Sequence, residues 1–273
     1  MITDTAVQEA MDQFVMSYSD KPAMPFSAER CMEMFAEYLL HYSDLYQDGE
    51  MVDEDELQEW EAALGEYVEN MLEGDDSSIE VEHIVELGSL PVSMLEAEHF
   101  RDFIGWSLLR ETGITSLEVE GCADMLHSWV SYLHQRHWLA SEKQITFLES
   151  IQELKDESMR ASQAARLLFH YVRLGGAVSP RNRGKRFEQF IEGHARISTL
   201  EKGSVHLCFD NKQLEIGPVA LPDEITRHLK LGDVLDIELG SRGGSWMIVD
   251  IGPVYPNEVY VDADEFEIPQ KLS

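Results

Sequence analysis

Two Glu-x-x-His sequences, Glu80 to His83 and Glu96 to His99, hold the side chains best suited to metal chemistry. Glutamate and histidine at positions i and i+3 share one face of a helix, and a dinuclear iron centre uses two such pairs with two further carboxylates. Acidic residues are so frequent in this chain that chance pairs are expected. Gly88 and Pro91 also separate the two pairs. A metal-dependent enzyme is therefore the hypothesis that we rank last.

Three histidines, His127, His134 and His137, fall on one expected helix, and the first two are seven residues apart on one face. Histidine titrates near neutral pH and binds metals, so a metal or general-base role is one interpretation. The preferred interpretation is that they lie partly buried at a contact between helices. The sequence identifies no catalytic residue, and we expect no cofactor.

An acidic segment between two expected helices, residues 44–55, places oxygen ligands at the spacing of a calcium-binding loop. Asp44, Asp48 and Gly49 match that spacing, but Tyr46 occupies a ligand position and Asp55 stands where a bidentate glutamate is needed. Tyr46 thus removes one carboxylate ligand, and the side chain of Asp55 is shorter than the glutamate that the loop needs. Asp44, Asp48 and Asp55 are therefore weak calcium candidates.

A short basic segment, residues 181–186, is the densest group of cations in the chain. Arg181, Arg183, Lys185 and Arg186 are its members. Three interpretations stay open: a solvated linker, a segment that docks on acidic helices, or a contact with phosphate groups of nucleic acid. With Arg227, these residues are the candidates for binding an anion or nucleic acid.

The chain has 273 residues, 44% of them hydrophobic, and a formal net charge of -31. Its length and hydrophobic content are enough for one large or two ordinary domains. The charge argues against a generic binder of DNA or anionic membranes, and it fits a basic partner or a saline habitat. The scattered Cys31, Cys122 and Cys208 indicate neither a disulfide framework nor a zinc site. Without a signal-peptide pattern or a long apolar run, we expect a cytoplasmic protein that does not contact a membrane.

Charge and hydrophobic spacing both change near residue 175. Residues 31–100 contain 21 acidic side chains and no Lys or Arg. Helical spacing of apolar residues predicts helices over 27–43, 55–74, 93–108 and 116–138, and one long helix or two stacked ones over 141–176. Ser27, Ser93 and Ser116 are the expected starts of three of them.

After residue 190 the sequence reads as short strands separated by turns. Five strands are expected over 193–201, 203–210, 212–221, 232–240 and 244–252, with one short helix over 222–230. Five strands in about 60 residues predict a small barrel. The fold class is therefore multidomain α and β: an acidic all-helical unit followed by a small five-stranded β-barrel.

The expected domains are an acidic helical domain over 1–175, a basic linker over 176–190, a barrel over 191–257 and an acidic tail over 258–273. The helical domain is either one unit or two, of about 1–75 and 78–175.

Residues 217–239, GPVALPDEITRHLKLGDVLDIEL, resemble the swapped-hairpin barrels of AbrB-like transition regulators and antitoxins. The matching positions are Gly217, Val219, Leu221, Pro222, Glu224, Ile225, Leu229, Gly232 and Asp233. The resemblance implies a small barrel. Pro218 and Thr226 replace two basic residues that this family uses on DNA, so Arg227 alone keeps that role.

Residues 94–140 are similar in layout to the N-terminal core-binding helices of tyrosine recombinases. This similarity implies a shared helical scaffold only, because the rest of the chain lacks the length and the pattern of a recombinase catalytic domain.

The leading functional hypothesis is a non-enzymatic binding or scaffolding protein. It would recognise a basic protein partner through its acidic helical surface and its barrel. A nucleic-acid-associated regulatory protein is the alternative, and it would use the barrel and residues 181–186. The barrel could instead serve as a homodimer interface.

Overall fold

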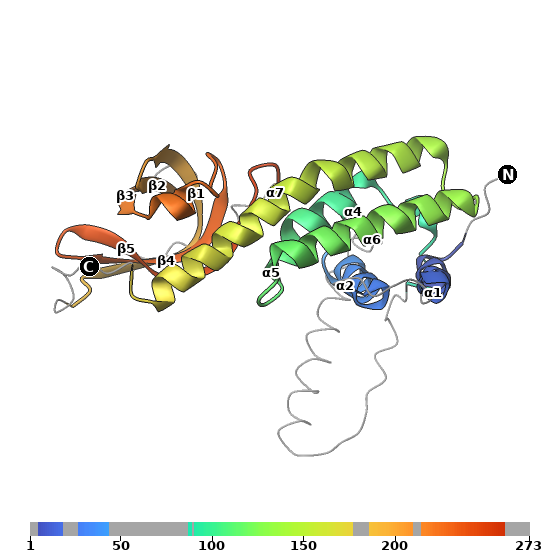
Figure 1. Cartoon of the computed structure of the whole chain (residues 1–273), viewed down its shortest axis with the longest axis horizontal. Helices are drawn as coiled ribbons and strands as arrows, with labels where there is room; N and C mark the ends of the chain where they lie inside the picture. The colour runs from blue at the N-terminus through green and yellow to red at the C-terminus, as the bar shows by residue number, and fades with distance from the viewer. Residues whose placement is uncertain are drawn as a thin grey trace, which may run out of the picture.

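The computed structural model describes residues 5–18, 27–43, 87–88, 90–176, 186–209 and 214–259. Helices come first and a five-stranded antiparallel sheet follows, as the sequence predicts (Figure 1). The helical elements are α1 (Val7–Tyr18), α2 (Ala28–His41), η2 (Val92–Met94), α4 (Ala97–Asp102), η3 (Phe103–Ser107), α5 (Leu108–Arg110), α6 (Ser116–Gln135), α7 (Ser141–Arg173) and α8 (Asp223–Thr226). No described helix combines the length and the apolar character that crossing a bilayer requires.

Side-chain caps explain where α2 and α6 begin. The Ser27 side chain accepts a hydrogen bond from the backbone N–H of Arg30, as expected of an N-cap. The α6 cap is Thr115, one residue before the expected Ser116. Thr115 and Glu118 form a reciprocal capping box. Both caps satisfy N–H groups that the first turn of a helix leaves without a backbone partner.

The prediction that a helix begins at Ser93 is wrong, and the helical segment that follows is not regular. Ser93 lies inside η2, and α4 begins three residues after that turn, with Glu96 as its N-cap. A π-helical turn, η3, then interrupts the α-helical hydrogen bonding before α5. Within η3, Gly105 lets Leu154 of α7 and Val259, which follows the last strand, approach its backbone closely.

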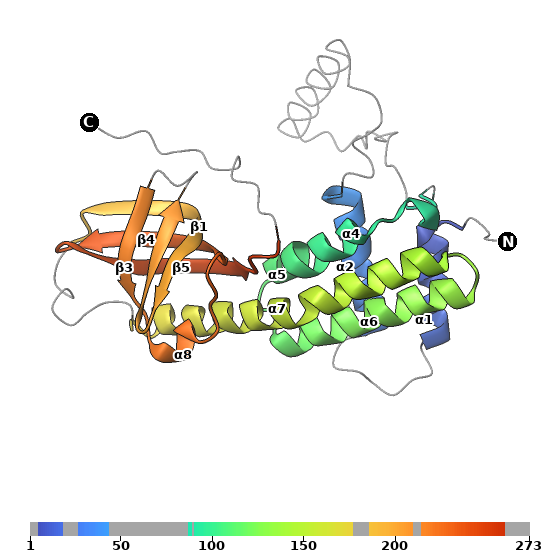
Figure 2. The same ribbon diagram turned by 90° about the horizontal axis from the view of Figure 1, so that it is seen from above.

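Helix α7 is one continuous helix of 33 residues. It extends from the helical end of the molecule along the sheet, so it belongs to both parts (Figures 1 and 2). Gly175, which follows the helix, has a φ of 72°. Glycine accepts this left-handed conformation without a steric cost, and the expected Gly-Gly stop is confirmed.

Aromatic side chains form the centre of the helical part. Phe35 is fully buried, and its ring centroid lies 5.0 to 6.1 Å from those of Tyr38, Phe100, Phe103 and Trp129. These rings come from α2, α4, η3 and α6. One cluster therefore joins elements that are about 100 residues apart in the sequence.

The strands are β1 (Gln189–Glu201), β2 (Ser204–Phe209), β3 (Leu214–Ala220), β4 (Val234–Arg242) and β5 (Ser245–Tyr255). Their order is β3-β2-β1-β4-β5, and every neighbouring pair is antiparallel. Buried and half-buried residues alternate along β2, which is typical of a strand with one covered face.

The expected small barrel is wrong in one respect, because the five-stranded sheet is not closed into a barrel. Among the described residues, no ladder joins the edge strands β3 and β5. Two features oppose closure. Pro218 removes a backbone donor from β3, and β3 is short beside the 11-residue β5. Helix α7 packs along the edge strand β5, and β3 and β5 lie near each other without forming a ladder among the described residues.

The limits of the four expected domains stay a prediction. Helices α1 and α2 pack on α6, and α6 packs on α7. The buried residues of the helices and those of the sheet form one continuous hydrophobic cluster.

Candidate functional site

The candidate site is a groove between α1 and α2, which we call the α1–α2 groove. Its volume is about 500 Å³. Both helices are amphipathic, and their inner faces are buried against the core. Twelve residues line the groove: Gln8, Met11, Asp12, Val15, Met16, Glu29, Met32, Glu33, Ala36, Glu37, Leu40 and Leu87.

Two methionines, Met11 and Met32, share the apolar floor of the α1–α2 groove with Val15, Ala36, Leu40 and Leu87. Met11 and Met32 are buried, whereas the side chain of Met16 is 76% exposed. Methionine is unbranched and polarisable, so a floor built from it adapts to partners of different shape. An exposed methionine beside this floor extends the apolar surface that a partner could cover.

Carboxylates form the rim of the same groove. Asp12, Glu29, Glu33 and Glu37 are all exposed. The described lining residues include no Lys or Arg to balance them. The α1–α2 groove therefore combines an apolar floor with a negative potential at its edges.

A second cluster, which we call the junction network, joins α7 to the sheet. The guanidinium of Arg160 donates to both carboxylate oxygens of Asp233, at 2.7 and 2.8 Å. It also donates to Glu157 and to the backbone carbonyl of His228. All five N–H donors of Arg160 are used, and Asp233 is fully buried.

Charges alternate across the junction network. Lys230 donates to Glu157 through its ammonium group at 2.6 Å and to Asp233 through its backbone N–H at 2.7 Å. Burial opposes ionisation of Glu157, but hydrogen bonds from Lys230 and Arg160 and their positive charges outweigh it. Together they hold the pKa of Glu157 below its ordinary value. The network thus pairs two charges of α7 with two charges of the segment between α8 and β4.

Acid should weaken the junction network through Glu157. A carboxyl whose pKa is lower in the folded state stabilises the fold above its unfolded pKa, and that stability is lost as pH falls through the folded value. We therefore expect the free energy of unfolding to fall as pH drops below the ordinary value of 4.5. Glu157→Gln should make this fall shallower in urea titrations at several pH values. The matched Glu149→Gln variant changes an exposed glutamate of the same helix. Its free energy of unfolding should depend on pH as steeply as that of the wild type. Equal slopes for Glu157→Gln and the wild type would contradict this assignment.

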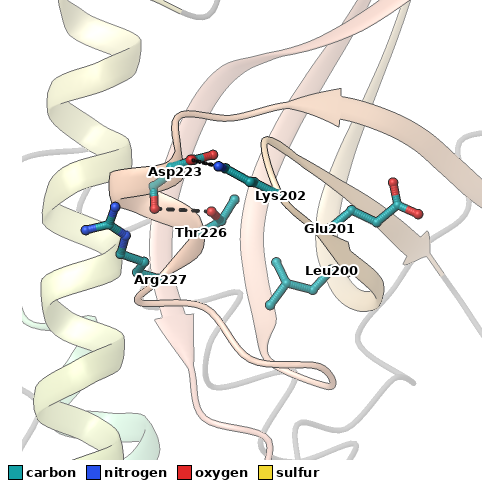
Figure 3. Close-up of a pocket in the computed structure, with 6 residues that line it drawn as sticks. All are labelled: Leu200, Glu201, Lys202, Asp223, Thr226 and Arg227. Carbon is teal, nitrogen blue, oxygen red and sulfur yellow. Dashed lines mark hydrogen bonds and ion pairs between the residues drawn. The ribbon is translucent and has the colours of Figure 1, made fainter.

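Of the residues proposed to bind anions, the structure describes Arg186 and Arg227. Arg227 is exposed and lines an open depression of about 350 Å³ with Leu200, Glu201, Lys202, Asp223 and Thr226 (Figure 3). The lining is balanced in charge, and Lys202 pairs with Asp223 at 3.4 Å. Arg186 is exposed just before β1. Arg181, Arg183 and Lys185 lie outside the described residues.

The Glu96–His99 pair serves as a helix cap. The backbone N–H of Glu96 donates to Nδ1 of His99 at 2.9 Å, and the Glu96 carboxylate accepts from Lys143 at 2.6 Å. Within the described part of the chain, no group of three or more His, Cys, Asp or Glu side chains is arranged to hold a metal ion. Glu80 and His83 lie outside that part, as do Asp44, Asp48 and Asp55.

The three histidines of the α6 region do not converge. His127 is exposed beside Phe14 and Tyr18, and His137 is exposed just beyond the end of α6. His134 is half-buried, and its Nδ1 lies 3.1 Å from the carbonyl of Leu139. Only His134 fits the expectation of a partly buried histidine.

Sequence reasoning missed Arg160 and its pairing with Asp233. A signal was present, because Arg160 lies among small residues of α7, and Ser158, Ala161, Ser162 and Ala164 are buried. Small side chains on one face let another element approach a helix closely. A cation in such a stretch needs a partner from that element.

No family model matches the chain, and no curated protein or solved structure was found to be similar to it. The resemblances to AbrB-like barrels and to recombinase helices therefore stay expectations. A functional assignment must rest on the α1–α2 groove and the other described surfaces.

Proposed function

We propose that this is a non-enzymatic binding or scaffolding protein that recognises a basic partner through its α1–α2 groove. One observation carries the proposal: four exposed carboxylates, one on α1 and three on α2, line the same groove as an apolar floor that includes two methionines, and the described lining supplies no cation. Apolar area supplies affinity, and complementary charge supplies a fast encounter and selection against acidic competitors.

The partner that best fits this groove is an amphipathic helix with Lys or Arg beside its apolar face. A groove between two helices takes a third helix through residues spaced at i, i+3, i+4 and i+7. Methionine side chains suit this mode, because they repack around differing apolar residues. Cations beside the apolar face would then reach Asp12 on α1 and Glu33 or Glu37 on α2.

The direct experiment uses the full chain and a fluorescent synthetic peptide of leucine and lysine at helical spacing. A peptide in which glutamate replaces every lysine is the control. We expect anisotropy to report binding of the lysine peptide alone, with affinity falling as salt rises. If the two peptides bind alike, or if neither binds, the proposed recognition is wrong.

Charge reversal at the rim should weaken binding. The double variant Glu33→Lys/Glu37→Lys replaces attraction with repulsion at two exposed positions of α2. The affinity for the lysine peptide should fall by about tenfold or more at low salt. Circular dichroism should be unchanged, because both side chains are exposed.

The matched control is Glu149→Lys/Asp250→Lys, which makes the same change of net charge on exposed surfaces of α7 and β5. It should leave the affinity within about twofold, because charges farther away than about 10 Å are largely screened at 0.1 M salt. If both double variants weaken binding equally, the overall field of the protein binds the peptide and the groove has no special part.

A second candidate function is association with single-stranded nucleic acid near the start of β1. Phe190 is 56% exposed, and its ring centroid lies 5.1 Å from that of Phe187. The guanidinium of Arg242 lies 3.8 Å from the Phe187 ring centroid. Aromatic rings with nearby arginine form platforms on which bases stack. Arg186 immediately precedes Phe187 in the chain.

The nucleic-acid candidate is tested with the full chain and a labelled single-stranded oligonucleotide at several salt concentrations. Specific support would be a salt-dependent affinity that Phe190→Ala lowers and Phe169→Ala, an exposed phenylalanine of α7, does not. Absence of binding at low salt removes this candidate.

A further inference from the structure

Cys31 of α2 and Cys122 of α6 form a pair of thiols inside the helical core. Their sulfur atoms lie 2.9 Å apart, and both residues are fully buried. The Cys31 thiol also lies within hydrogen-bonding distance, 3.5 Å, of the carbonyl oxygen of Cys122. Because 91 positions of sequence separate the two residues, only the packing of α2 on α6 brings the sulfurs together.

We propose that Cys31 and Cys122 are a site of two-electron oxidation, at which a peroxide converts the two thiols into one intramolecular disulfide. A disulfide requires sulfurs about 2.05 Å apart, so they need to approach by only about 0.9 Å. The bond would attach α2, which carries one wall of the α1–α2 groove, covalently to α6.

The reaction balances in two steps. One sulfur, as a thiolate, attacks a peroxide oxygen, which breaks the O–O bond and gives a sulfenic acid and, with hydrogen peroxide, a hydroxide that is protonated to water. The second sulfur then attacks the sulfenic sulfur, forms the S–S bond and releases a second water. Two thiols are oxidised to one disulfide, and one hydrogen peroxide is reduced to two waters.

Proximity, and not intrinsic reactivity, selects this pair. Burial, together with the hydrogen bond and the charge of Cys122, raises the pKa of the Cys31 thiol well above its ordinary value. The thiolate is the reactive form, so the first step should be slow in the folded protein. Once a sulfenic acid forms, the second sulfur is already in place, and the disulfide should form before further oxidation.

Cys208 provides an internal comparison. It lies on β2 in the sheet and is only half-buried. Its greater exposure should make it react sooner with a soluble thiol reagent. Cys208 should not join the disulfide, because Cys31 and Cys122 are buried in the helical core. Replacing it with serine leaves a full-length chain with only the two paired thiols.

The test compares folded and urea-unfolded Cys208→Ser protein after treatment with hydrogen peroxide. Peptide mapping without reductant should recover one linked peptide containing Cys31 and Cys122, and both thiols should disappear together in a titration under denaturing conditions. In glutathione redox buffers, the equilibrium constant for the disulfide should be about 100-fold larger for the folded chain than for the unfolded one. The oxidised protein should melt roughly 5–15 °C higher than the reduced one.

Three outcomes would overturn the proposal: sulfinic acid on one sulfur without a disulfide, linkage between two chains, or equal equilibrium constants in the folded and unfolded protein. The glutathione measurement uses the unchanged pair, so its outcome does not depend on a variant that fails to fold. Cys122→Ala, checked by circular dichroism, should leave Cys31 unable to form the linked peptide. Binding of the lysine peptide is not a readout, so this proposal stands or falls separately from the proposed function.

Discussion

Replacing Arg160 with alanine should lower the free energy of unfolding by about 3–5 kcal/mol, because it breaks a buried ion pair and leaves one charge behind. Asp233 is fully buried, and two of its hydrogen bonds come from the guanidinium of Arg160. Without that partner, the backbone N–H of Lys230 would still donate to the carboxylate, but both guanidinium hydrogen bonds would be lost. Burying an unpaired carboxylate is far more costly than removing an exposed charge.

Urea unfolding followed by tryptophan fluorescence measures this loss. Arg166→Ala is the matched control, since it removes an exposed arginine from the same helix and should change stability by less than about 0.5 kcal/mol. The double variant Arg160→Met/Asp233→Leu should be more stable than Arg160→Ala, because it removes both buried charges together. A loss below about 1 kcal/mol for Arg160→Ala would mean that water reaches Asp233 and that the junction network contributes little.

Phe35→Ala should cost about 3–5 kcal/mol, the range for removing a large aromatic side chain from a packed core. Phe35 is fully buried at the centre of the aromatic cluster that joins α2, α4, η3 and α6. Its removal leaves a cavity among rings from four elements, and these elements cannot all move inward together. A less firmly packed α2 should also lower the affinity for the lysine peptide, because α2 forms one wall of the α1–α2 groove.

The matched control for Phe35 is Phe169→Ala on α7. That side chain is 42% exposed, so its removal opens no closed cavity and should cost less than about 1 kcal/mol. Urea titrations of the two variants give the comparison directly. Similar losses for both would show that the aromatic cluster is loosely packed and does not hold α2 in place.

Local sequence signals located α2, α6, α7 and the five strands to within a few residues, but they did not predict α1, and the helix expected over 55–74 lies outside the described residues. Ser27 begins α2 as its hydroxyl predicts, and the Gly-Gly sequence ends α7. The five strands lie where short alternating segments and turns place them. These features depend on neighbours within a few residues, so the sequence alone is enough to predict them.

Long-range contacts decided what the local signals could not. Glu96 and His99 resemble a metal pair in sequence, but in the structure they cap α4, and the Glu96 carboxylate accepts a hydrogen bond from Lys143. The spacing of strands in the sequence does not distinguish a closed barrel from an open sheet, because closure depends on which strands pair. Pro218 weakens β3 as a partner, and α7 packs along the other edge strand, β5.

The amino-acid sequence by itself determined the excess of acidic side chains, the change from helices to strands and the approximate positions of the strands and of α2, α6 and α7, because composition and local spacing are sufficient for these. Tertiary structure decided that Arg160 meets Asp233 across 73 positions, that Cys31 meets Cys122 across 91, and that α1 and α2 enclose a methionine-lined groove. Such meetings depend on how whole helices pack. That packing is set by the summed burial of many side chains and by no motif within a single segment.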